Sequence, residues 1–182
     1  WRTSFAPERG FLPWYFAHEI AHVRQSVEDR PITDAFMREA WVQEGGAEAL
    51  AALAVRDVYP HLSDYVDARI ARAVADCAAA LAETRGAEPS ADSRYACGLA
   101  VQMAIDADLR RTSGGARSLV DVWRLFLETT ARGAPWSAAE FLRCARLAGA
   151  SEEATALAAA VATRPGPSAA AALLRSRRAA TP

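Results

Sequence analysis

The sequence predicts an all-α fold, organised as a single domain over residues 1–182. Alanine and arginine, which both favour helix, are used heavily. The chain also divides into apolar or amphipathic stretches that are separated by proline, glycine and capping residues, as expected for successive helices. Its length suffices to bury a sizeable core. Residues 1–12 are expected to form an irregular N-terminal segment, and residues 164–182 a tail or a last helix.

Charge and composition argue against several classes of protein. The formal net charge of -1 provides no electrostatic footprint for nucleic acid or for a membrane surface. No apolar run reaches the length of a membrane span. Three cysteines, at positions 77, 97 and 144, are widely spaced and odd in number, so buried free thiols are expected. The chain begins at Trp1 without a visible signal peptide. We interpret it as a fragment or a processed form, which leaves the compartment open.

Two helices joined by a short connection are expected first. The first helix should cover about residues 13–29, with a proline in its first turn. Arg30-Pro31 should end it, because the residue before a proline disfavours helix. Thr33 or Asp34 can cap the second helix, over about residues 35–58. The short connection makes the two helices antiparallel.

The first of these helices carries the pattern His18-Glu19-Ile-Ala-His22 within an apolar run. Two histidines four residues apart share one helix face, so both imidazoles can reach one metal ion at about 2.0–2.1 Å. Glu19 lies about 100° round the helix, where a base for a metal-bound water is needed. These five residues alone are equally compatible with one surface and one core histidine on an ordinary helix.

Helix dimensions bring Glu44 to the same level. The distance from His22 to Asp29 is about 10 Å of helix, and from Asp34 to Glu44 about 15 Å. In an antiparallel pair, Glu44 therefore returns to the height of the histidines. Two histidines and one glutamate form a known zinc ligand set that leaves a fourth position open for water. The alternative is that Glu44 belongs to a solvated face, which its mostly Ala, Leu and Val neighbours oppose.

Glu48 and a glycine pair accompany Glu44 on the second helix. Glu48 is one turn further along the same face, where it can accept a hydrogen bond from a metal-bound histidine, or simply face solvent. Glycine inside a helix costs about 1 kcal/mol relative to alanine. Gly45-Gly46 therefore indicates a close approach, which we expect to be made by the histidine-bearing helix.

Further helices follow to the end of the chain. A third is expected over residues 60–86, where His61 is interpreted as a surface or capping residue and not as a metal ligand. A fourth should begin near Ser93 and stop at Gly114-Gly115. A fifth helix is predicted to begin at the capping residue Ser118, aided by Asp121. A sixth should run from a cap at Ser137 to about Leu147, with Gly149 closing it. Two further helical pieces are expected over residues 151–163 and 168–178.

Taken together, the H-E-x-x-H pattern and the later Trp41-x-x-Glu44-Gly45 resemble the gluzincin zinc metallopeptidases, which include thermolysin-like enzymes. Among these, the chain is similar to the aminopeptidase N-like enzymes and more closely to the glycyl aminopeptidase family, whose members often carry a PDZ domain. The resemblance covers about residues 11–147. It implies that His18, His22 and Glu44 bind one Zn²⁺ and that Glu19 is the general base.

A third stretch supports the same resemblance. Tyr95-Ala-Cys97-Gly98, which precedes an apolar helix and a Gly-Gly stop, is similar to a Tyr-x-Lys-Gly motif of the family. Taken alone, Tyr95 is more typical of a core or rim residue. The resemblance implies that Tyr95 donates a hydrogen bond to the oxyanion of the tetrahedral intermediate. Cys97 replaces the lysine of the motif.

The expected function is therefore that of a zinc-dependent, aminopeptidase-like peptidase acting on a peptide or protein substrate. The expected fold is the helical catalytic half of a gluzincin, without the N-terminal β subdomain, so an upstream β subdomain and a PDZ-like domain are possible partners in a longer protein. Val-Arg-Gln-Ser follows His22, in place of the Trp and Asn common in relatives. This difference motivates an alternative, a metal-binding but catalytically inactive helical module of a larger protein. A helical bundle without metal is a third hypothesis.

Overall fold

The structure is a computed structural model, which describes residues 9–25, 39–83, 91–163 and 166–180. Within these ranges the chain is helical and contains no strand, as the sequence predicts. The elements are α1 (Phe11–Gln25), α3 (Ala40–Val58), the 3-10 turn η1 (Pro60–Leu62), α4 (Ser63–Glu83), α5 (Ala91–Ser113), α6 (Leu119–Ala131), α7 (Ala138–Leu147), α8 (Glu152–Thr163) and α9 (Pro167–Ala180). None of the helices in the described part is long and apolar enough to cross a membrane.

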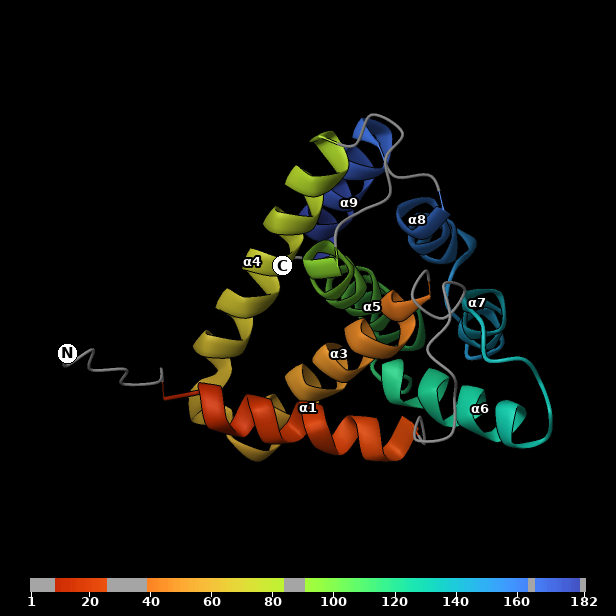
Figure 1. The fold of residues 1–182 in the computed structure, drawn as a ribbon, viewed down its shortest axis with the longest axis horizontal. Coiled ribbons are helices and arrows are strands. Elements are labelled where there is room, and N and C mark those ends of the chain that lie inside the picture. The colour runs from red at the N-terminus through yellow and green to blue at the C-terminus, as the bar shows by residue number, and fades with distance from the viewer. Residues whose placement is uncertain (1–8, 26–38, 84–90, 164–165, 181–182) are drawn as a thin grey trace.

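The helices surround a central pair. Figure 1 shows α3 and α5 in the interior, with α1 along one side and α4 along another. The most extensive packing is between α3 and α5, followed by α4 on α5 and α1 on α3. The antiparallel helix pair expected from the sequence is thus part of a larger bundle, in which α5 packs on a different face of α3 from α1.

Two glycines set the contact between α3 and α5. A Cβ atom at Gly45 would lie 2.2 Å from the Cα atom of Gly98, and one at Gly98 would lie 2.6 Å from the Cα atom of Gly45. A Cβ atom at the neighbouring Gly46 would lie 2.1 Å from the Trp123 ring of α6. The glycine pair does mark a close approach, but the expectation that α1 makes it is wrong. The approaching elements are α5 and α6, which pack on other faces of α3.

A buried amide strengthens the same contact. Gln102 of α5 is fully buried and donates hydrogen bonds to the backbone oxygens of Trp41 (3.2 Å) and Val42 (2.9 Å) in α3. Its side-chain oxygen accepts a hydrogen bond from Trp123 Nε1 at 2.9 Å. Because every polar atom of this side chain has a partner, the amide joins three helices without a desolvation penalty.

The cysteines differ from the prediction. Cys77 of α4 and Cys97 of α5 form a disulfide, with their Cα atoms 4.8 Å apart. Only Cys144 is a buried free thiol, as expected. Linear spacing could not reveal the pair, because the two cysteines meet only once α4 packs on α5. The bond ties the wall of the bundle to the turn of α5 that follows Tyr95.

Several helix ends that were predicted from capping residues are confirmed by the structure. The Asp121 carboxylate accepts a hydrogen bond from the Ser118 amide at 2.9 Å, and the Ser137 hydroxyl accepts one from the Glu140 amide at 3.2 Å. Gly114 ends α5 with φ +61°, and Gly149 follows α7 with φ +104°. These positive φ values favour glycine, which explains why the predicted stops hold.

Several predicted boundaries move. The first helix begins at Phe11, inside the segment predicted to be irregular, and α3 begins at Ala40, later than expected. Pro60 opens a 3-10 turn before α4, where His61 is exposed as predicted. The helix predicted over residues 168–178 is present as α9, from Pro167 to Ala180. The predicted end of the first helix, Arg30-Pro31, the caps at Thr33 or Asp34 and the end of the third helix lie outside the described residues.

Candidate metal centre

Three predicted ligands converge between α1 and α3. His22 Nε2 lies 3.0 Å from His18 Nε2 and 3.2 Å from Glu44 Oε2, and His18 Nε2 lies 3.8 Å from the same carboxylate oxygen. All three side chains are partly buried. The predicted position of Glu44 is thereby confirmed, since the carboxylate does return to the level of the histidine pair. The helix lengths from which it was predicted include residues 26–38, which lie outside the described part. No other such group of metal-ligating side chains occurs in the part of the chain that the structure describes.

The His22 ring is held by a buried glutamine. Gln25 is fully buried and donates from Nε2 to the backbone oxygen of Gln43 at 3.0 Å. This bond turns the amide oxygen of Gln25 toward His22 Nδ1, 2.9 Å away. An oxygen acceptor places a proton on Nδ1, so Nε2 is the atom that faces the cluster, where it can bind either a second proton or a metal ion.

The His18 ring has a similar support. Its buried Nδ1 atom lies 3.2 Å from Glu48 Oε1, although not in hydrogen-bond alignment. A carboxylate at this position favours a protonated Nδ1 and therefore a free Nε2 lone pair. Glu48 thus lies where the sequence places it, behind a candidate ligand, and the same arrangement orients metal-bound histidines in proteins generally.

Glu48 is itself fixed by two further side chains. Its Oε2 atom accepts hydrogen bonds from Trp14 Nε1 at 3.0 Å and from Arg69 at 3.2 Å. The Arg69 guanidinium also lies over the Trp14 ring, 4.4 Å from its centroid. Residues from α1, α3 and α4 therefore meet at one carboxylate, which makes Glu48 a junction of the bundle as well as a neighbour of His18.

The three candidate ligand atoms fit a tetrahedral metal ion. Bonds of about 2.0–2.1 Å at tetrahedral angles separate ligand atoms by about 3.3 Å. The observed separations of 3.0, 3.2 and 3.8 Å bracket that value. With both Nδ1 atoms facing oxygen atoms, the two Nε2 atoms and one carboxylate oxygen form a compact set of possible ligand atoms.

The pKa shifts of His22 and Glu44 in the metal-free site also favour a bound cation. The hydrogen bond to Glu44 raises the pKa of His22 against the effect of partial burial. Burial would raise the pKa of Glu44, but its hydrogen bond and charge interaction with His22 outweigh burial and lower the pKa. A positive charge is therefore favoured between these side chains, and in the metal-free chain a proton on His22 supplies it.

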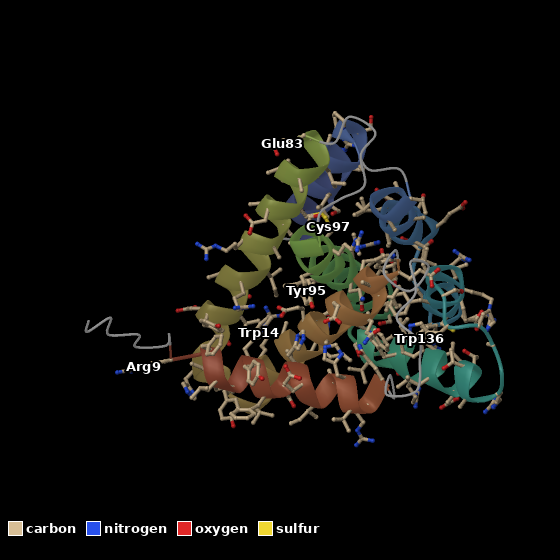
Figure 2. All side chains as sticks on the ribbon, viewed as in Figure 1. Arg9, Trp14, Glu83, Tyr95, Cys97 and Trp136 are labelled. Carbon is tan, nitrogen blue, oxygen red and sulfur yellow. A yellow bond between two sulfur atoms is a disulfide. The ribbon has the colours of Figure 1, made fainter. Side chains whose placement is uncertain are left out.

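Tyr95 and Glu19 flank the cluster from different helices. The Tyr95 ring stacks near His18 at a centroid distance of 6.5 Å, and its hydroxyl interacts with Glu44. Partial burial, together with the Glu44 carboxylate, raises the pKa of Tyr95 to about 12, so the hydroxyl keeps its proton. Glu19 is exposed on α1, and no hydrogen bond or ion pair joins it to another described residue. Figure 2 shows Tyr95 near the middle of the bundle and Trp14 on α1.

Sequence reasoning missed Gln25, Trp14 and Arg69. Gln25 follows His22 by three residues and Trp14 precedes His18 by four, so both share the histidine face of α1. That spacing is a usable signal. Arg69 comes from α4 and has no comparable signal, because its approach to Glu48 depends on how α4 packs.

No protein-family model, curated protein or solved structure matched the chain when it was compared with each of the three. The case for a function therefore rests on the residues of the site and their geometry.

Proposed function

We propose that the chain is a zinc-dependent peptidase of the gluzincin kind, in which His18, His22 and Glu44 hold one zinc ion. The observation that carries the proposal is the orientation of the two imidazoles. Gln25 occupies His22 Nδ1 and Glu48 lies against His18 Nδ1, so both Nε2 atoms are directed at the Glu44 carboxylate. The same arrangement, in which an oxygen atom faces one ring nitrogen and leaves the other for the metal, orients metal-bound histidines in proteins generally.

The chemistry follows from the groups around this set. A bound zinc ion acts as a Lewis acid that polarises a carbonyl group and acidifies a water. Glu19 takes the proton from the attacking water and later passes it to the leaving amine. Its exposed, unpartnered carboxylate on α1 suits this role. Tyr95 keeps its proton, because its pKa is raised to about 12, and can donate a hydrogen bond to the oxyanion.

The resemblance to gluzincins, and within them to the glycyl aminopeptidase family, is part of the proposal. Its support is that three separate motifs, around His18, Glu44 and Tyr95, converge in one place although they come from three helices. The preference for an amino-terminal residue and the presence of further domains in a longer protein belong to the same proposal.

The test compares wild type with Glu19→Gln, both supplied with zinc. We expect hydrolysis of a fluorescence-quenched peptide mixture to fall about 10²–10⁴-fold in Glu19→Gln, with zinc content unchanged. Glu128→Gln alters an exposed carboxylate on α6 and serves as the control. Retained turnover in Glu19→Gln would contradict the assignment of the base. Bound zinc without turnover in wild type would support the alternative of an inactive module.

A further inference from the structure

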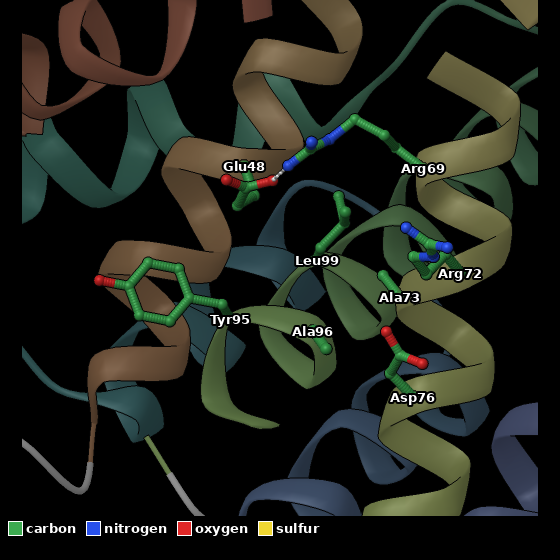
Figure 3. A pocket seen from close by; sticks show the side chains of 8 residues that line it. All are labelled: Glu48, Arg69, Arg72, Ala73, Asp76, Tyr95, Ala96 and Leu99. Atoms are coloured by element: carbon green, nitrogen blue, oxygen red, sulfur yellow. Dashed lines mark hydrogen bonds and ion pairs between the residues drawn. The ribbon is translucent and has the colours of Figure 1, made fainter. Parts of the chain in front are cut away.

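A hollow lies beside the candidate metal centre, between α4 and α5. It has a volume of about 380 Å³ and shares two residues, Glu48 and Tyr95, with the surroundings of the metal site. Figure 3 shows the Tyr95 ring on one side of it and Arg72 and Asp76 of α4 on the other. A group that enters the hollow therefore lies next to the side chains that contact His18 and Glu44.

The walls of this hollow are covalently joined. Cys77 follows Asp76 in α4, and Cys97 follows Ala96 in α5, so the Cys77–Cys97 disulfide joins the two helices at residues next to the lining. The contact between Gly98 and α3 holds the same turn of α5 from the other side. The spacing between the walls is therefore fixed by the fold, which is a condition for selective binding.

Two of the charged groups that line the hollow already have partners. The Glu48 carboxylate accepts hydrogen bonds from Trp14 and Arg69, and the Arg69 guanidinium is stacked on the Trp14 ring. Because Glu48 and Arg69 neutralise each other, neither is available for a ligand without breaking the support of His18.

The remaining charged groups are Arg72 and Asp76. Both are exposed, and among the described residues neither has a hydrogen bond or an ion pair, including one with the other. Arg72 follows Arg69 by one helical turn and offers five N–H donors in a planar fork. A carboxylate can take two parallel hydrogen bonds from such a fork, a stronger and more directional arrangement than a single ion pair at Asp76.

We propose that this hollow is a substrate side-chain pocket, and that Arg72 selects a side chain ending in a carboxylate. The inference rests on the proposed peptidase function only where it calls the ligand a substrate. The carboxylate binds the Arg72 guanidinium, while the Tyr95 ring and Leu99 contact the aliphatic part of the same side chain. Arg72 is a specificity residue, because it lies across the hollow from the side chains that would perform the reaction.

The test uses the full chain without metal, so that it depends on neither zinc nor turnover. N-acetyl-glutamate α-amide and its neutral isostere N-acetyl-glutamine α-amide are titrated into the protein, and binding is followed by NMR. The two probes differ only in the carboxylate. We expect the glutamate probe to bind more tightly, and Arg72→Gln to weaken its binding about tenfold. The control Arg146→Gln removes an exposed arginine of α7 and should change nothing.

Three results would overturn the proposal. The first is equal binding, or no binding, of the two probes by wild type. The second is unchanged affinity in Arg72→Gln, with circular dichroism showing that the variant is folded. The third is preferred binding of N-acetyl-lysine α-amide that is lost in Asp76→Asn, which would assign the pocket to a cation. If the chain binds no zinc but the glutamate probe behaves as expected, the peptidase proposal fails while the carboxylate site remains.

Discussion

The two helices that carry the candidate ligands are held in different ways. α3, with Glu44, lies between neighbours and touches α5 at the Gly45–Gly98 contact. α1, with both histidines, packs on α3 through one face only. Its outer face exposes large apolar side chains, with Phe16, Ile20 and Val23 at 59%, 62% and 70% exposure.

This difference indicates how the site is assembled. The carboxylate ligand is positioned by backbone packing that does not depend on the site. The histidines depend on Trp14, which is 2% exposed, and on polar contacts made by Gln25 and Glu48, which are part of the site itself. A bound metal ion should therefore stabilise α1 more than α3 or α5, since it adds a bond across the less supported boundary.

The largest effect is expected from breaking the support of α3. In Gly98→Ala, the added methyl group would meet the backbone of Trp41 at 2.5 Å and of Gly45 at 2.6 Å. Backbone atoms cannot move aside cheaply, so we expect the free energy of unfolding to fall by about 3 kcal/mol. Urea denaturation measures this quantity. Gly166→Ala is the control, because open space surrounds that position and the loss should stay below about 1 kcal/mol. An equal loss of stability in Gly98→Ala and Gly166→Ala would show that the contact between α3 and α5 does not require glycine at position 98.

Adding zinc should protect α1 from amide hydrogen exchange more than it protects α5. At a hundred-fold excess over its dissociation constant, a ligand that binds only the folded state adds about 2.7 kcal/mol of stability. We expect amide hydrogen exchange to slow more in Phe11–Gln25 than in Ala91–Ser113. Mass spectrometry of peptides from both helices tests this. Uniform slowing, or none in α1, would contradict the view that the metal fastens α1.

Removing the amide behind His22 should weaken metal binding without removing a ligand. Gln25→Ala frees the His22 ring and removes the hydrogen bond that Gln25 donates to the Gln43 oxygen. Groups that orient a ligating histidine typically contribute about 10–100-fold in metal affinity. Competition with a coloured chelator measures that affinity. The matched control is Arg24→Ala, which changes the exposed neighbouring side chain. A zinc affinity of Gln25→Ala equal to that of wild type would show that Gln25 does not contribute to metal binding.

The smallest effect concerns pH and applies to the metal-free chain. The pKa of His22 is raised above 6.5, so its contribution to stability is complete below pH 6.5 and is lost as the pH rises through the raised value. The pKa of Glu44 is lowered below 4.5, so its contribution is complete above pH 4.5 and is lost as the pH falls through the lowered value. Both contributions are therefore present between pH 4.5 and pH 6.5.

Urea unfolding at a series of pH values, for wild type and Glu44→Gln, measures this dependence. We expect the stability of wild type to decline above pH 6.5 and that of Glu44→Gln to decline less. The same decline in both proteins would show that Glu44 does not raise the pKa of His22. Zinc should bind more tightly as the pH rises, because it competes with the proton on His22.

Some parts of the structure followed from the sequence because they depend on local rules. The helix ends at Ser137 and Gly149 follow from capping, and the position of Glu44 follows from the rise per residue along two antiparallel helices. The disulfide and the Gly45–Gly98 contact did not follow, since both arise from how α5 packs against its neighbours. Arg69 was missed for the same reason. Tyr95 was singled out only through a resemblance.

The most direct test of the proposal is the zinc content of the purified chain. Wild type and Glu44→Gln are incubated with zinc, desalted and measured by elemental analysis. We expect about one zinc ion per chain in wild type, the stoichiometry of a three-ligand catalytic site, and much less in Glu44→Gln. Wild type without zinc, or Glu44→Gln with as much zinc as wild type, would contradict the assignment of His18, His22 and Glu44 as a metal centre.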